Sequence, residues 1–95
     1  MYARVVISQL IPGKANQAIA IWRDKLVPVM KEAKGFKGAY ILGNRETGEG
    51  MTVTLWETEA DADAMNSSFR VTIGFFEGLF AVPPELSQME VLLQV

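Results

Sequence analysis

Extended and helical patterns follow one another in the order β-α-β-β-α-β, and this order constrains the fold more than any other feature. Alternating and β-branched residues predict strands at 2–10, 36–44, 51–57 and 85–95. Apolar residues at spacings of three and four predict helices over 15–34 and 58–82. Ninety-five residues suffice for one domain, so we expect a single α+β domain over residues 1–95.

The first helical segment contains a proline that conflicts with a regular helix. Its apolar stripe consists of Ala15, Ala18, Ile19, Trp22, Leu26, Met30 and Ala33. Pro28 lies within the segment, where it removes one backbone hydrogen bond and kinks the axis. Because the stripe continues beyond it, we expect a kink rather than an end.

The second helical segment begins at Thr58, which we expect to cap the first turn. The acidic residues around this cap resemble a metal cluster, but a helix N-terminus favours negative charge, so we interpret them as a solvated helix start: Glu57, Glu59, Asp61 and Asp63. The apolar face further along consists of Phe69, Ile73, Phe76 and Phe80. Pro83 and Pro84 predict the end of the helix, and the last strand then follows over 85–95.

The element order is that of the ferredoxin-like fold, a four-stranded antiparallel sheet ordered 4-1-3-2 with both helices on one face. The other face would have no cover within one chain. Strand residues such as Val5 and Ile7 are too apolar for a solvated face, and 49% of the chain is apolar. A chain of this size buries only about 60–65% of its unfolded surface when it folds alone. We therefore expect a homodimer that pairs sheet to sheet, because a monomer would need cleaner polar alternation.

The composition excludes several classes of function. A net charge of −2 and the lack of a basic stripe argue against a nucleic-acid partner. The chain has no cysteine and no histidine, which excludes disulfides, Ser-His-Asp chemistry and His-ligated zinc or haem. No apolar run reaches the about 20 residues that span a bilayer, and no signal peptide is recognisable. We expect a cytoplasmic protein with neither a metal nor a membrane partner.

Six short segments together resemble the antibiotic biosynthesis monooxygenase family of dimeric α+β barrels. They are 1–5, 12–14, 20–23 followed by Pro28, 35–39, 44–48 and 53–57. The resemblance covers most of the chain and implies a dimeric barrel. Members of the family include cofactor-independent oxygenases of polycyclic aromatics, haem-degrading enzymes and domains without an assigned reaction.

The haem-degrading branch does not fit these residues. The resemblance would require an Asn on the first strand, a Trp in the second helical segment and a His ligand beyond it. The corresponding positions hold Val6 and approximately Met65, and the chain has no His. We therefore expect no cofactor.

The cofactor-independent branch implies a dry aromatic pocket with donors that stabilise a substrate anion. The candidate catalytic residues are Arg4, Tyr40 and Asn66. The candidate substrate-binding residues are Ser8, Trp22, Phe69, Arg70, Ile73, Phe76 and Phe80. The protein would then be a monooxygenase of a small aromatic or apolar molecule, or a related proton-transfer enzyme such as an isomerase on the same scaffold.

Each candidate also has a purely structural interpretation. Trp22 and the phenylalanines suit a packed core, and Trp56 at a strand end suits packing as well. Arg4 and Glu57 lie on strands that should be antiparallel neighbours, so a cross-strand ion pair is the default expectation. Arg70 near a helix start suits a solvated position, and Tyr40 suits a half-buried strand position.

Two other functions compete with an enzyme. The same topology suits a non-catalytic dimer that binds a small molecule or has a regulatory role. It also suits an RNA-recognition module, because the segment 34–40 echoes that module's aromatic signature. That segment falls on the second strand rather than the third, and the acidic charge balance also argues against RNA.

Overall fold

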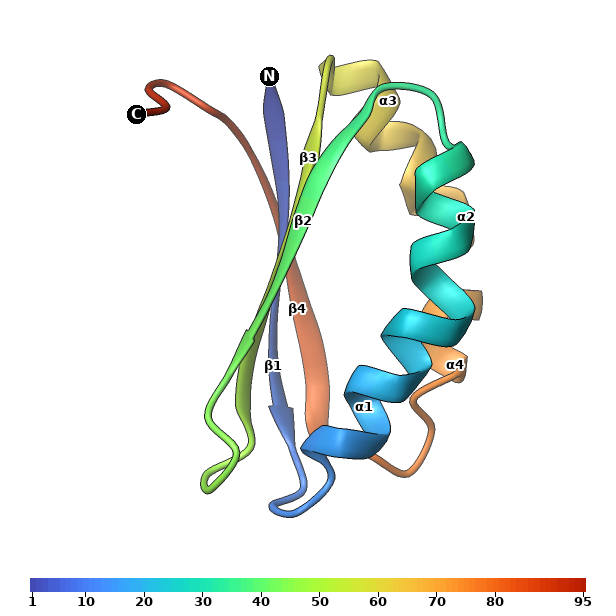
Figure 1. Ribbon diagram of the computed structural model, residues 1–95, viewed down its shortest axis with the longest axis vertical. Helices are drawn as coiled ribbons and strands as arrows, with labels where there is room; N and C mark the ends of the chain where they lie inside the picture. The colour runs from blue at the N-terminus through green and yellow to red at the C-terminus, as the bar shows by residue number, and fades with distance from the viewer.

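The computed structural model describes all residues 1–95 and has two layers. The antiparallel sheet has the order β2-β3-β1-β4, which confirms the predicted ferredoxin-like topology. Its strands are β1 (Tyr2–Leu10), β2 (Phe36–Gly43), β3 (Glu49–Trp56) and β4 (Phe80–Glu90). All helices lie on one face of this sheet, and the two chain ends lie at the same end of it (Figure 1).

The first helical segment runs without a break past Pro28. It consists of α1 (Ala15–Ile21), a π-helical turn η1 (Trp22–Leu26) and α2 (Val27–Glu32). In the wide turn the Val27 N–H bonds to the Trp22 carbonyl, five residues back. Because a π-turn spaces carbonyls differently from an α-helix, it accommodates the ring and missing N–H of Pro28, which lies in the first turn of α2. The predicted continuity is confirmed.

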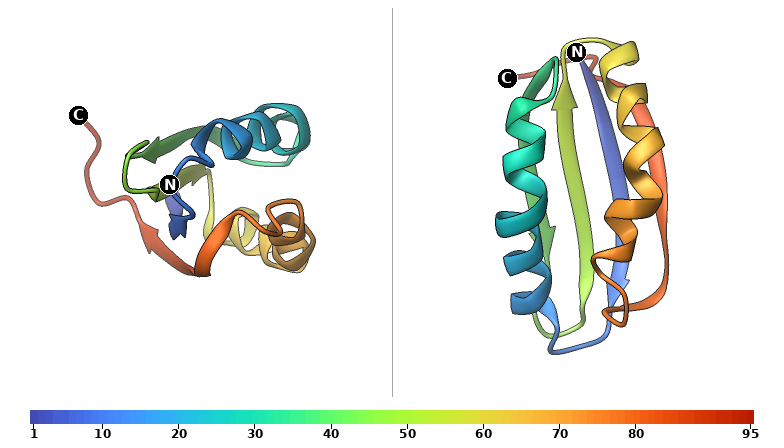
Figure 2. Two further views of the ribbon diagram at one scale, coloured as in Figure 1. Left: turned by 90° about the horizontal axis from the view of Figure 1, so that it is seen from below. Right: turned by 90° about the vertical axis from the view of Figure 1, so that its right-hand side faces the viewer.

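The second helical segment consists of α3 (Glu59–Asp63), a 3-10 turn η2 (Ala64–Ser68) and α4 (Phe69–Gly74). The Thr58 hydroxyl accepts a bond from the Asp61 N–H at 3.1 Å, so the predicted cap is confirmed. Figure 2 shows both helical segments side by side along the same face of the sheet. The loop that follows the first segment approaches the second at Gly35, where a Cβ atom would clash with the Asp61 carboxylate.

The end of this segment and the start of the last strand were predicted wrongly. β4 begins at Phe80 and ends at Glu90, so Pro83 and Pro84 lie within a strand instead of stopping a helix. β4 is an edge strand, and its register with β1 shifts between Ile7 and Gln9. Prolines are tolerated on edges and at bulges because no ladder N–H is needed there.

The helix-covered face holds the packed core. Trp56 is fully buried, its indole N–H donates to the Thr54 hydroxyl at 2.9 Å, and it meets the Phe36 ring edge-on at 5.4 Å. The predicted packing role of Trp56 is confirmed. A second cluster of buried side chains lies between the helices: Ala18, Leu26, Phe76 and Leu79.

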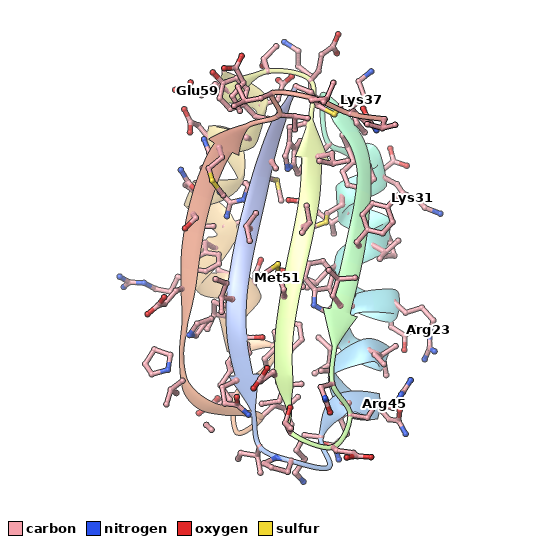
Figure 3. The ribbon with its side chains drawn as sticks, turned by 90° about the vertical axis from the view of Figure 1, so that its left-hand side faces the viewer. Arg23, Lys31, Lys37, Arg45, Met51 and Glu59 are labelled. Atoms are coloured by element: carbon pink, nitrogen blue, oxygen red, sulfur yellow. The ribbon has the colours of Figure 1, made fainter.

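The opposite face of the sheet has no cover within the chain, and Figure 3 views it with Met51 near its middle. We call it the open face; its apolar side chains include Val5, Ile7, Leu42, Met51, Val53 and Met89. Ile7 is 47% exposed and Leu42 is 50% exposed.

No helix of the chain has the length and apolarity that crossing a membrane requires.

Candidate functional site

A cavity of about 180 Å³ lies between the helices and the sheet. Of the 25 residues that line it, 15 are hydrophobic. An engineered cavity of about 150 Å³ can hold benzene, whereas pockets for drug-sized ligands start at about 300 Å³. The cavity therefore has room for about one aromatic ring with a small substituent.

Alternate residues of β1 form the sheet side of this cavity. Side chains along a strand alternate between faces, so one set faces the helices: Arg4, Val6, Ser8 and Leu10. Thr52 and Thr54 on the neighbouring strand β3 also line the cavity and were not predicted. Their alternation with Met51 and Val53 was the signal that could have found them.

Aromatic residues form the helix side of the cavity. Six of the seven predicted substrate-binding residues line the cavity: Ser8 from β1, and Trp22, Phe69, Ile73, Phe76 and Phe80. The Trp22 and Phe76 rings lie 6.3 Å apart between centroids, and the Phe76 and Phe80 rings lie 5.6 Å apart. Phe76 is also buried in the core cluster. The rings were expected either to form a packed core or to line a ligand pocket. They do both, because they pack against one another and also border the cavity.

Arg4 is the buried charged residue of the site, with only 5% of its surface exposed. Its Nη1 donates to the Ala62 carbonyl at 3.4 Å and to the side-chain oxygen of Asn66. The guanidinium also lies 5.7 Å from the centre of the Phe69 ring, within the range of a cation–π contact. Burial lowers the pKa of Arg4 below its usual range, and the nearby Asp63 charge partly offsets this effect. An arginine nevertheless stays charged near neutral pH.

The predicted ion pair between Arg4 and Glu57 is wrong. Arg4 lies opposite Thr54 in the β1–β3 register, and its side chain points to the helices. Glu57 instead lies 3.9 Å from the Lys37 ammonium at the exposed end of the strands. Strand proximity alone was therefore a poor guide, because the face of each side chain decides its partners.

Two predicted residues are not brought to the cavity. Tyr40 is 63% exposed, and its register opposite Val53 puts it on the open face. The cause is a register shift between Phe36 and Gly38, which inserts one residue into β2 and reverses the face of those that follow. Arg70 is exposed on α4 and does not line the cavity. Asn66 reaches the site through its bond to Arg4.

Two further charged residues border the cavity at its other end. Arg45 and Glu49 come from the β2–β3 hairpin, where Arg45 donates to the Asn16 side chain. Figure 3 places Arg45 at the end of the sheet opposite Glu59 and Lys37. The cavity thus has a polar, exposed mouth and a single buried cation at its inner end.

No protein-family model and no curated protein matches the chain. Solved structures match it over nearly its whole length. One is a protein of Nitrosomonas europaea considered an antibiotic biosynthesis monooxygenase, at TM-score 0.78 and 15% identity over 96% of this chain and 89% of that one. The chain has the fold of the antibiotic biosynthesis monooxygenases.

Two other matches to this monooxygenase fold differ in their chemistry. SnoaB of Streptomyces nogalater, a cofactor-independent oxygenase, matches at TM-score 0.76 and 11% identity over 99% of this chain and 95% of that one. The heme-degrader MhuD of Mycobacterium tuberculosis, with two hemes bound in its active site, matches at TM-score 0.75 and 17% identity. This match covers 100% of this chain and 99% of that one. These likenesses concern the fold.

The residues of the cavity do not fit a haem. Its lining contains no His, Cys or Tyr that could serve as a proximal ligand. Val6 and Met65, at the positions where the resemblance would require Asn and Trp, both line it as apolar side chains. Its volume of about 180 Å³ suits a single ring rather than a tetrapyrrole. We therefore derive no haem chemistry for this chain.

Proposed function

We propose that this protein binds a small aromatic or similarly apolar molecule in the cavity and oxygenates it without a cofactor. The observation that carries the proposal is the pairing of an aromatic wall with one buried cation, Arg4, at its inner end. The shared fold with a cofactor-independent oxygenase supports it.

The proposed chemistry starts from the substrate's own electrons. A phenolic or enolic substrate loses a proton, and its anion transfers an electron to O₂. The substrate radical and superoxide then combine at carbon to give a peroxide. This peroxide takes up a proton and loses water as its O–O bond breaks, so that overall a CH₂ group and O₂ become C=O and water. Arg4 would stabilise the anion, and Asn66 would hold the guanidinium in place. The aromatic wall would keep bulk water from the reacting carbon.

A non-catalytic small-molecule binder is the second candidate. The charged residues that line the cavity are Arg4, Arg45 and Glu49, and Glu49 lies at the exposed hairpin. No side chain at the inner end is a base near neutral pH, so the proton would have to pass to water, with Ser8 or Thr54 as a relay. A pocket that binds without turnover requires no such path.

Oxygen uptake separates these two functions. The purified protein is mixed with a panel of phenols and naphthols in an oxygen electrode, with a metal chelator present. We expect uptake that Ile73→Trp abolishes, because the larger ring fills the cavity. The matched control is Val71→Trp, which changes an exposed position on the same helix, α4. Ligand binding without uptake would favour the binder, and uptake that survives Ile73→Trp would remove the cavity from the reaction.

We also propose that the open face pairs with the open face of a second copy. Apolar side chains cover its central strands, and Ile7 and Leu42 remain about half exposed in the single chain. Pairing two such sheets face to face would remove this surface from water. The sequence resemblance to dimeric barrels supports the same arrangement.

A further inference from the structure

Arg4 forms no ion pair within the chain. The two ion pairs that form join Arg23 to Asp24 and Lys37 to Glu57, both at exposed positions. Arg4 is buried, and its partners are a neutral amide, a carbonyl and an aromatic ring. A buried charge without an opposite charge is costly, so an anion that reached it would be bound favourably.

Most of the donor capacity of Arg4 is unused. A guanidinium has five N–H groups, and only those of Nη1 have acceptors in the protein. Every buried side-chain nitrogen and oxygen of the chain has a hydrogen-bond partner. Nε and Nη2 of Arg4 have none, so both must still reach space that is open to solvent. Arg4 lines the cavity, and these two nitrogens form a fork that matches two acceptor oxygens.

The surrounding charges leave the inner end of the cavity positive. Arg45 and Glu49 lie at the mouth and oppose each other in charge. Asp63 on α3 acts on Arg4 only from beyond ion-pair distance, because its carboxylate accepts from the Gln88 amide and is in neither ion pair. All other residues that line the cavity are apolar or neutral, among them Val6, Thr54, Met65 and Phe69.

We infer that the ligand of this cavity is an organic monoanion: one aromatic ring, or an apolar body of that size, with a negatively charged oxygen on Arg4. This inference deepens the proposed function and rests on the cavity being its ligand site. The charged oxygen can belong to a carboxylate or to a phenol or enol that ionises near neutrality. Both present acceptor oxygens to the free N–H groups, and both fit a volume of about 180 Å³.

Isothermal titration with a matched pair of probes tests the carboxylate. Benzoate and benzamide have the same ring and nearly the same shape, but only benzoate is charged. We expect benzoate to bind the wild-type protein at least about tenfold more tightly, because hydrogen bonds to charged groups are the stronger ones. Arg4→Gln should remove this preference and retain benzamide binding, which also shows that the variant is folded.

Two further variants control this experiment. Arg4→Lys keeps the charge and should restore part of the preference, because an ammonium is a point donor without the fork. Arg23→Gln removes an exposed arginine away from the cavity and should leave both affinities unchanged. Equal binding of the two probes to the wild-type protein, or no binding of either, would exclude the carboxylate, and together with an unshifted ionisation of a bound phenol it would overturn the inference.

A phenol that ionises near neutrality tests the other source of charge. The absorbance of 4-nitrophenol reports its ionisation directly, and we expect the bound dye to ionise at lower pH than the free dye. Arg4→Gln should abolish this difference. A shift without benzoate selectivity would identify a phenolate, and selectivity without a shift would identify a carboxylate.

These results are separable from the fate of the proposed reaction. Selective binding of either anion without oxygen uptake would support the anion site and contradict the oxygenase. Oxygen uptake that Arg4→Gln leaves unchanged, on a substrate bound equally well by both proteins, would support the oxygenase and contradict the anion site.

Discussion

The two faces of the sheet present the same strands to different surroundings. On β1, Arg4, Val6 and Ser8 face the helices and line a cavity, whereas Val5 and Ile7 point to the open face. The helix-covered face buries a charge among apolar side chains, and the open face exposes apolar side chains to solvent. On the helix-covered face, a bound anion would supply the negative charge that Arg4 lacks. On the open face, a second protein surface would remove the apolar side chains from water. Both surfaces arise because the side chains of β1 alternate between the two faces of the sheet.

The largest effect should come from charging the open face. Replacing Val5 and Ile7 together with Asp would place two charges in the proposed seam between copies, where burial of an unpaired charge is costly. We expect light scattering to show a monomer or an unfolded chain instead of a dimer. The matched control replaces Val29 and Val71 with Asp, two exposed valines on the outer helix surfaces, and should leave the dimer intact. A well-folded dimer of the first variant would assign the interface elsewhere.

The two tryptophans test how tightly the helix-covered face is packed. Trp56 is fully buried, so Trp56→Ala should lower the free energy of unfolding by about 3–5 kcal/mol. Trp22 is half-buried and borders the cavity, so Trp22→Ala should cost less, about 1–3 kcal/mol. Urea unfolding measures both. Equal losses would mean that Trp22 is an ordinary core residue and not a wall of the cavity.

A smaller effect is expected where Asn66 holds Arg4. Asn66→Ala removes an acceptor from a buried charged donor and should cost about 1–2 kcal/mol of unfolding free energy. Asn16→Ala is the matched control, because Asn16 accepts from the exposed Arg45. Its cost should stay below about 0.5 kcal/mol, since exposed contacts contribute little. Similar costs for the two variants would show that burial does not strengthen the bond to Arg4.

The smallest effect concerns the outer end of β1. The carboxylate of Glu59 raises the pKa of the Tyr2 phenol, first through a hydrogen bond and then through its charge. The stabilisation is present below the usual tyrosine pKa and is lost as the pH rises through the raised value. In a Tyr40→Phe background, an absorbance titration reports Tyr2 alone, and Glu59→Gln should lower its midpoint. An unchanged midpoint would remove Glu59 as the cause.

The fold followed from the sequence because strand periodicity, helix stripes and a capping threonine all agreed. The same alternation placed Arg4 and Ser8 on one face. Three features could not be predicted for physical reasons. An inserted residue near Gly38 reversed the face of Tyr40, and a bulge in an edge strand accepted the proline pair. Asn66 meets Arg4 across 62 residues of chain, a contact that only tertiary packing reveals.

The central position of β1 has a consequence for how the chain is made. β1 leaves the ribosome before β3 and β4, yet it lies between them in the sheet, and β4 is the last of the four strands to be synthesised. One hydrogen-bonding edge of β1 therefore stays without its partner until β4 has been synthesised, and such long-range pairing forms slowly. A ribosome halted before Phe80 would hold a three-stranded sheet with a bare edge, and this nascent form is the one most exposed to aggregation.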